Sequence, residues 1–168
     1  LLEVFNNQPV FFVLLALVLT YLSYSSLAIV LLSVSFLATG VIGLNESLYI
    51  VLGANLGSGM LPLISSWNSS DLEKNPIIAN LIVRSLCIVL FYPFVSVFSN
   101  FSITFISVEL VPAIYHLSLN ISVAIIGIIF SKQFLSISFS LFSENKIEGQ
   151  LNNHNILESD DFSMPAVS

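Results

Sequence analysis

Charged residues are scarce in this sequence. They make up 8% of its 168 residues, whereas a soluble domain carries about 25%. No charge occurs between Glu3 and Glu46, between Glu46 and Asp71, or between Glu109 and Lys132. Uncharged apolar stretches longer than about 18 residues are typical of transmembrane helices. The scarcity of charge therefore excludes a soluble core and predicts a multi-pass integral membrane protein.

Other residue types are also too rare for several classes of function. The chain has one cysteine, Cys87, and two histidines, so we expect neither a disulfide framework nor a metal site, and Cys87 is interpreted as a small buried hydrophobe. Four basic residues do not make a nucleic-acid surface. Within the apolar stretches no nucleophile–base pair is visible, and an enzyme is not expected. The first residue is leucine and no basic segment precedes the apolar run, which indicates no signal peptide and suggests a fragment of a longer protein.

The chain is predicted to be all-α, with a membrane domain at residues 1–142 and a polar, acidic tail or linker at 143–168. Residues 9–40 form an apolar run of 32 residues, although about 20 suffice for one crossing. The polar stretch SYSSLA interrupts this run at residues 23–28. Two half-helices meeting at residues 24–26, as a re-entrant hairpin, explain both features. The other expected elements are a broken helix at 46–67, helices at 77–97 and 108–130, and an interfacial segment at 135–142.

The stretch VLGANLGSGMLP, residues 51–62, places three glycines, an asparagine and a proline inside one predicted span. Gly53 and Gly57 have the four-residue spacing of a helix-packing face. Alternatively, the glycines mark an unwound segment whose carbonyls and half-helix ends bind ions, as in transporters with discontinuous helices. Asn55 and the second polar break in the hairpin favour the binding site. We therefore expect residues 53–59 to be non-helical or kinked.

Four motifs follow one another in an order that resembles the sodium-dependent phosphate cotransporter family, in its bacterial branch. LTYLSYSSLA (19–28) and GANLGS (53–58) are similar to the Q-S-S-S-A and G-A-N-[IL]-G-[TS] elements that this family carries in each of two inverted repeats. NPIIANLIVRSL (75–86) and IYHLSLNIS (114–122) resemble two downstream stretches, and residues 155–168 resemble the linker after the membrane domain. Tyr24 stands in place of the glutamine, and Leu27 in place of the last serine.

The resemblance implies one half of an inverted-repeat transporter, corresponding to the second repeat. Its function would be sodium-coupled transport of inorganic phosphate across the cell membrane, with Na+ as the coupling ion. The first repeat of the same transporter would be missing from this chain, and a PhoU-like cytoplasmic domain would be a possible partner. The family places the tail in the cytoplasm, whereas Lys74 and Lys132 at opposite ends leave the orientation undecided. A carrier of another small anion and a non-transporting or decayed remnant are the alternatives, the latter supported by Tyr24, Leu27 and the missing half.

Several polar residues are candidates for the ion and substrate site. Arg84 is the one charge well inside a predicted span, where it is costly and is expected to point into the protein. Its planar fork suits phosphate, or it is a structural partner for helix carbonyls or for an acid such as Glu46 or Glu109. His116 and Asn120, four residues apart on one helix face, are expected to form an interhelical hydrogen bond. The candidate binding residues are Tyr24, Ser25, Ser26, Gly53, Asn55, Gly57, Ser58 and Arg84.

Overall fold

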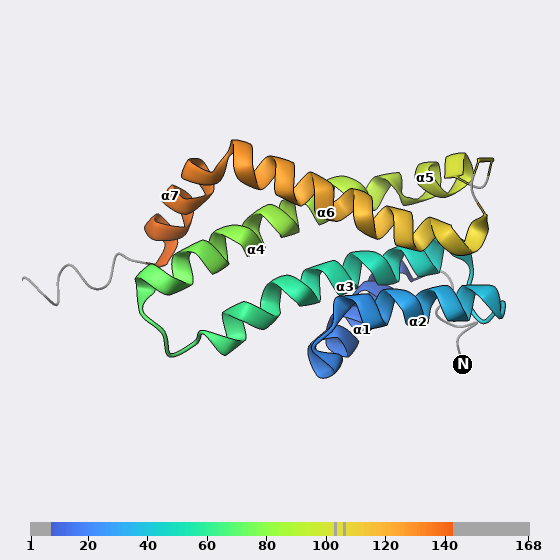
Figure 1. Cartoon of the computed structure of the whole chain (residues 1–168), viewed down its shortest axis with the longest axis horizontal. Helices are drawn as coiled ribbons and strands as arrows, with labels where there is room; N and C mark the ends of the chain where they lie inside the picture. The colour runs from blue at the N-terminus through green and yellow to red at the C-terminus, as the bar shows by residue number, and fades with distance from the viewer. Residues whose placement is uncertain (1–7, 103, 106, 143–168) are drawn as a thin grey trace, which may run out of the picture.

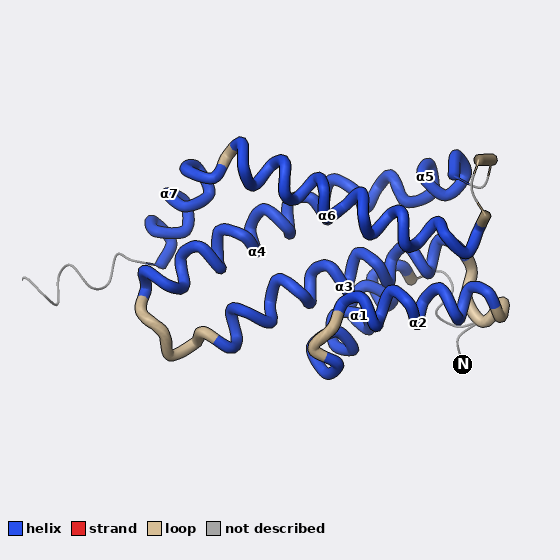
Figure 2. The backbone as a smooth tube through the Cα atoms, in the orientation of Figure 1, coloured by secondary structure: helices blue, strands red, loops and turns tan. Residues whose placement is uncertain are grey.

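Every regular element in the described part of the chain is helical (Figures 1 and 2). The structure is a computed structural model that describes residues 8–102, 104–105 and 107–142, so the tail predicted at 143–168 lies outside the described residues. The helices are α1 (Pro9–Ser23), α2 (Ser26–Ala38), α3 (Leu44–Ser65), α4 (Asp71–Phe91), α5 (Val95–Ser102), α6 (Val111–Ile129) and α7 (Ser131–Phe142), with 3-10 turns at Tyr92–Phe94 and Val108–Leu110.

The first apolar run is two short helices, α1 and α2, joined by a tight turn. Tyr24 ends α1 in the left-handed conformation, with φ at 54°. Ser25 is the N-cap of α2, and its side-chain oxygen accepts a hydrogen bond from the Ala28 amide at 3.2 Å. A serine in this position satisfies an amide that the new helix leaves unpaired. The predicted break in residues 9–40 therefore lies between the C-cap of α1 at Tyr24 and the N-cap of α2 at Ser25.

Helix α3 is unbroken, so the prediction of an unwound segment at residues 53–59 was wrong, while a kink in this segment stays a prediction. The broken helix expected at 46–67 is one continuous helix, Leu44–Ser65. Its glycines serve close packing instead: a Cβ on Gly53 would overlap the Val13 carbonyl of α1, and one on Gly57 would lie 2.8 Å from the Cβ of Thr20. The packing face, which spacing alone also indicated, is thus the role of these two residues.

Pro62 causes one irregularity in α3, and it lies after the segment 53–59 in which an irregularity was expected. Pro62 lies inside the helix and has no backbone N–H, so the carbonyl four residues earlier, that of Ser58, loses its helical partner. The freed backbone acceptor therefore lies at the end of the GANLGS motif, without any unwinding of the glycines.

Helix α3 is the centre of the bundle. It packs against α1 and α2 on one side and against α4 and α6 on the other, as Figure 1 shows. Of its most apolar 18 residues, 56% are buried, compared with 22% in the spans Leu72–Ser102 and Val108–Ile129. These three segments are long and apolar enough to cross a membrane. The two outer spans expose large aliphatic side chains, which suits contact with lipid.

The outer helices begin and end where proline and charge dictate. Helix α4 begins at Asp71, six residues before the expected 77, since acidic residues suit the positive N-terminal end of a helix. The 3-10 turn that contains Pro93 follows it, because Pro93 has no N–H with which to continue the helical hydrogen bonds. Pro112 lies in the first turn of α6, where its missing N–H costs nothing. Helix α7 begins at Ser131, four residues before the expected interfacial segment.

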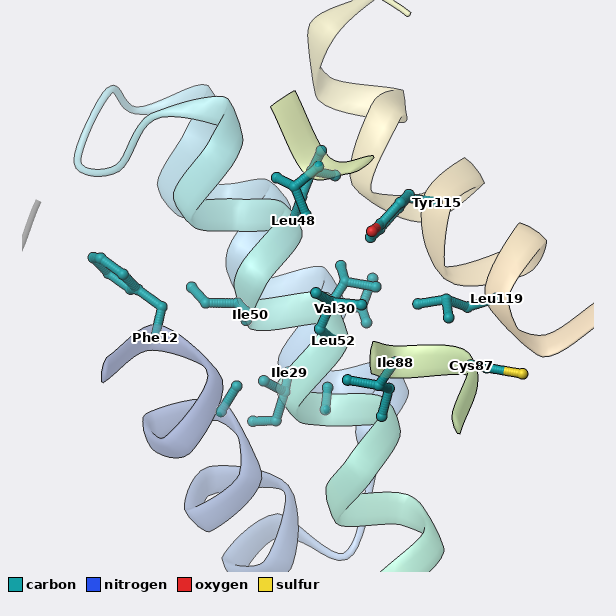
Figure 3. Close-up of a cluster of buried hydrophobic side chains, with 14 of the residues drawn as sticks. Phe12, Ile29, Val30, Leu48, Ile50, Leu52, Cys87, Ile88, Tyr115 and Leu119 are labelled. Atoms are coloured by element: carbon teal, nitrogen blue, oxygen red, sulfur yellow. The ribbon is translucent and has the colours of Figure 1, made fainter. Parts of the chain in front are cut away.

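A single apolar core joins the hairpin to the other helices. Figure 3 shows it as side chains from α1, α2, α3, α4 and α6 that meet around α3. Tyr115 is its largest fully buried member, and the hydroxyl donates to the Phe91 carbonyl at 3.2 Å. This bond connects α6 to the last residue of α4 and so fixes the two outer spans beside each other.

Candidate functional site

A cluster of polar side chains lies inside the bundle where α3, α4 and α6 meet. Its members are Asn55 and Ser58 from α3, Arg84 from α4, and His116 and Asn120 from α6. Buried polar groups are costly in a membrane unless they are hydrogen-bonded. Asn55 is buried and the other four are half-buried, so five polar residues meeting from three helices are a candidate site as well as a structural contact.

Arg84 is the hub of this cluster. Its Nη1 donates to the Asn55 side-chain oxygen at 3.0 Å, to the Ser58 hydroxyl at 3.1 Å and to the Asn120 side-chain oxygen at 3.4 Å. A fourth contact, of 3.4 Å, runs to the Asn55 backbone carbonyl. Arg84 thus points into the bundle, and all its recorded partners among the described residues are neutral. The acids Glu46 and Glu109, considered from the sequence, are not among them.

Asn55 connects the arginine to the histidine. The residue is 1% exposed, and its side-chain oxygen is occupied by Arg84, which leaves its amide nitrogen as the donor. That nitrogen lies 3.2 Å from the Val51 carbonyl and 2.9 Å from His116 Nδ1. A neutral imidazole has one acceptor nitrogen, so Nδ1 accepts from Asn55 only in the tautomer whose ring hydrogen is on Nε2. In that tautomer the Asn120 amide nitrogen, 3.2 Å from Nε2, does not donate to the ring.

Asn120 joins the cluster from the next turn of α6. Its amide nitrogen lies 2.8 Å from the His116 carbonyl and 3.2 Å from His116 Nε2, and its oxygen faces Arg84. Residues four apart on a helix lie on the same face. His116 and Asn120 therefore present one polar surface to α3 and α4.

Gly59 provides the space that Arg84 occupies. A Cβ on Gly59 would lie 2.8 Å from the Cδ of Arg84 and 3.1 Å from Cδ1 of Leu81. Any larger residue would push the arginine stem away from Asn55. Gly59, the third glycine of the stretch VLGANLGSGMLP, thus faces α4, whereas Gly53 and Gly57 face α1.

A cleft of about 640 Å³ adjoins the cluster between α4, α6 and α7. Asn80, Arg84, Asn120 and Ser131 contribute polar groups to its lining. The Nε of Arg84 is buried and has no hydrogen-bond partner among the described residues. Arg84 thus lines the cleft, and its Nε, which lies beside Gly59, is a donor without a recorded acceptor; a guanidinium with an unused donor suits an anion.

The residues at the hairpin turn lie apart from this cluster. The Ser23 hydroxyl bonds the Thr20 and Ser25 carbonyls, and Ser25 caps α2, while Tyr24 is 71% exposed. No recorded hydrogen bond between described residues joins Ser25 or Ser26 to Asn55. Helix α3 stands between the two groups, since Gly57 contacts α1 and Gly59 contacts α4.

Two residues near the site were not predicted from the sequence. Asn80 lines the cleft four residues before Arg84, and this spacing on one helix face was a signal that could have found it. The hydroxyl of Thr20 is buried without a partner among the described residues. It lies beside Gly57, and nothing in the sequence singled it out from the other hydroxyl residues.

Three apolar helices long enough to cross a membrane, with a polar cluster where they meet, indicate a multi-pass α-helical membrane protein. The sequence profile of the Na+/Pi-cotransporter family matches residues 1–128. Because this match covers more than half of the chain, the protein belongs to the Na+/Pi-cotransporter family. The resemblance to this family and the expectation of a non-enzyme are confirmed.

Curated relatives are similar over a shorter stretch. A protein of Salmonella typhimurium named "Putative inorganic phosphate export protein YjbB" is 34% identical over 79 residues, which is 47% of this chain and 14% of the relative. The Escherichia coli K12 protein of the same name is 35% identical over 74 residues, 44% of this chain and 14% of the relative. The matched part thus spans about one seventh of the relatives' length. No solved structure matches this chain.

Proposed function

We propose that this chain forms one half of a membrane transporter that moves inorganic phosphate together with sodium. Membership of the Na+/Pi-cotransporter family supports phosphate as the substrate and Na+ as the coupling ion. The names of the relatives mention phosphate export, a direction in which phosphate and sodium move together only when the phosphate gradient outweighs an inward sodium gradient. The observation that carries the proposal is Arg84, a half-buried cation beside a cleft, with only neutral hydrogen-bond partners recorded among the described residues.

Phosphate would approach Arg84 through the cleft between α4, α6 and α7. All recorded bonds of the guanidinium use Nη1, so Nη2 and Nε remain to donate to two phosphate oxygens, which is the geometry that arginine favours. Asn55 and Asn120 hold the guanidinium in place, and Asn80 adds an amide to the wall of the cleft. A half-buried arginine inside a membrane span, with no acidic partner recorded among the described residues, is costly, and an anionic ligand offsets that cost.

Sodium would bind among oxygen atoms on the α3 side of the site. The Ser58 carbonyl lacks a helical partner because of Pro62, and such freed carbonyls coordinate Na+ in transporters with interrupted helices. We assign the α1–α2 turn, with Tyr24, Ser25 and Ser26, to the same transport pathway, as the tip of a re-entrant hairpin. Gly53 and Gly57 act indirectly, by letting α1 approach α3.

The second half of the site would come from the other inverted repeat. In this arrangement each repeat contributes one hairpin and one GAN-containing helix near the middle of the cell membrane, and the tail lies in the cytoplasm. The inward-facing and outward-facing orientations differ in relative stability between the occupied and the empty transporter. This difference allows alternating access. A PhoU-like partner domain remains a prediction of the sequence.

Radiolabelled phosphate flux in proteoliposomes, measured with the complete protein and with and without a sodium gradient, tests the proposal. Arg84→Gln removes the proposed partner of the anion, and Asn55→Ala removes a side chain that holds Arg84 in place. Ser26→Ala tests whether the α1–α2 turn belongs to the transport pathway. Each is expected to lower sodium-dependent flux at least tenfold, since a hydrogen bond to a charged group contributes about 1.5–3 kcal/mol. Ser35→Ala is the matched control, because Ser35 is exposed on α2 and bonds its own helix at the Leu31 carbonyl.

Different outcomes separate the alternatives. If the Arg84→Gln and Asn55→Ala variants transport phosphate as fast as the Ser35→Ala variant, at equal abundance in the membrane, the proposed site is refuted. Faster transport of sulfate than of phosphate would favour a carrier of another small anion. No flux in the wild-type protein would favour the non-transporting remnant that Tyr24 and Leu27 suggest.

A further inference from the structure

A second cleft lies on the other side of α4, away from the arginine cluster. It has a volume of about 640 Å³ and lies between the end of α3, the first half of α4 and the end of α7. Its apolar lining comes from Leu63, Ile78, Leu81, Ile82 and Leu141. Neither Arg84 nor Asn120 contributes to it, so this cleft is separate from the proposed phosphate pathway.

One end of this cleft is polar and the other apolar. Trp67, Lys74 and Asn75 line it near the loop between α3 and α4, where two spans end and the membrane surface is expected. Leu81 and Ile82 line it one to two helical turns deeper. From Lys74 to Ser85 the wall extends along α4 for about 16 Å, at 1.5 Å per residue. An exposed tryptophan and a lysine at a span's end are typical of the headgroup level of a bilayer.

Asn75 provides the observation that points to a ligand. This side chain is 1% exposed, and its oxygen accepts a hydrogen bond from the Ser138 hydroxyl at 2.8 Å. Its amide nitrogen is buried without a partner among the described residues. A buried donor without an acceptor is unfavourable, and Asn75 lines this cleft beside the half-buried Lys74.

We propose that this cleft binds a phospholipid. The phosphate group lies between Lys74 and Asn75, where the ammonium offers charge and the amide nitrogen obtains its missing acceptor. One acyl chain follows α4 past Ile78 toward Leu81 and Ile82. Basic pockets between transmembrane helices bind anionic headgroups in this manner. Glu73, the neighbouring acid, is exposed and does not line the cleft.

Native mass spectrometry of the complete protein in mild detergent tests this site, with dioleoyl-phosphatidylglycerol as the probe. Dioleoylglycerol, which has the same chains without the phosphate, is the matched probe. The wild-type protein is expected to retain the phospholipid and not dioleoylglycerol, and excess inorganic phosphate should not displace it. Lys74→Gln is expected to weaken phospholipid binding about fivefold, the effect of one basic residue near anionic lipid.

Two further variants make the test specific. Lys132→Gln removes the other lysine near a span's end, which does not line the cleft, and should leave binding unchanged. Ile82→Trp fills the apolar part and should reduce binding of the phospholipid at unchanged elution volume. Equal retention of the two probes, equal effects of Lys74→Gln and Lys132→Gln, or full binding by a folded Ile82→Trp would each overturn the proposal. Displacement of the lipid by inorganic phosphate would do so as well.

Discussion

Replacing Gly53 by alanine tests whether the glycines of α3 serve packing. The new methyl group would overlap the Val13 carbonyl oxygen and lie 2.9 Å from the Cβ of Ala16, whereas ordinary contacts of a Cβ begin at 3.4 Å. The Val13 carbonyl belongs to the backbone of α1 and cannot rotate away. Helix α1 must therefore move off α3, which loosens the core around Phe12 and Ala16.

The matched control isolates the size of this effect. Overpacking of a core costs about 1–3 kcal/mol, but alanine also stabilises a helix by about 1 kcal/mol relative to glycine. Gly127→Ala brings the same helix-propensity gain without a clash, since the nearest atom to its new Cβ is the Val83 Cγ1 at 4.0 Å. The difference between the two variants is therefore the packing term alone, about 1–3 kcal/mol.

Thermal unfolding in detergent, followed by the fraction that elutes as a monodisperse peak, measures this difference. At about 2–4 °C per kcal/mol for a chain of this size, Gly53→Ala should unfold several degrees below Gly127→Ala. Gly57→Ala should fall between them, because its clash is chiefly with the side chain of Thr20. If Gly53→Ala and Gly127→Ala unfold together, α1 does not pack on α3 as described here.

Two further predictions concern hydrogen bonds outside the arginine cluster. Tyr115→Phe removes the bond to the Phe91 carbonyl and should destabilise the protein by about 0.5–1.5 kcal/mol in the same unfolding assay; unchanged stability would show that this bond does not hold α4 to α6. Ser138→Ala removes the hydrogen bonds of α7 to Asn75 and should speed hydrogen exchange in α7. Ser140→Ala is the control and should not change the exchange rate, because the Ser140 hydroxyl is exposed and bonds the Ile137 carbonyl of its own helix. Equal exchange in the two serine variants would mean that the Ser138 contact does not anchor α7.

The break in the first apolar run was predictable because its cause is local. The stretch SYSSLA contains a residue that caps a helix through its own side chain, and Ser25 does so three residues before the Ala28 amide it binds. Capping depends on neighbours in sequence, so sequence alone can locate it. The inward direction of Arg84 was predictable for a similar reason, since the cost of a charge in lipid does not depend on which helix is nearby.

The role of the glycines was not predictable in the same way. A glycine in a membrane helix permits unwinding and also permits a close neighbour, and the spacing of Gly53 and Gly57 is compatible with both. The choice depends on whether another helix approaches, and α1 approaches this face closely enough that no Cβ fits. The partners of Arg84 were likewise set by tertiary structure: amides from α3 and α6 reach it, while the acids considered from the sequence are not among its recorded partners.

The GANLGS motif is thus divided between two faces of one helix. Gly53 and Gly57 face the hairpin helix α1, and Asn55 and Ser58 face Arg84. Because α3 is helical through the motif, a shift of α1 relative to α3 is not taken up by an unwound segment at the glycines. It must move the asparagine as well, and with it the support of the arginine. A rigid helix with a packing face and a polar face therefore provides mechanical contact between the hairpin and the polar cluster, which an unwound segment would not.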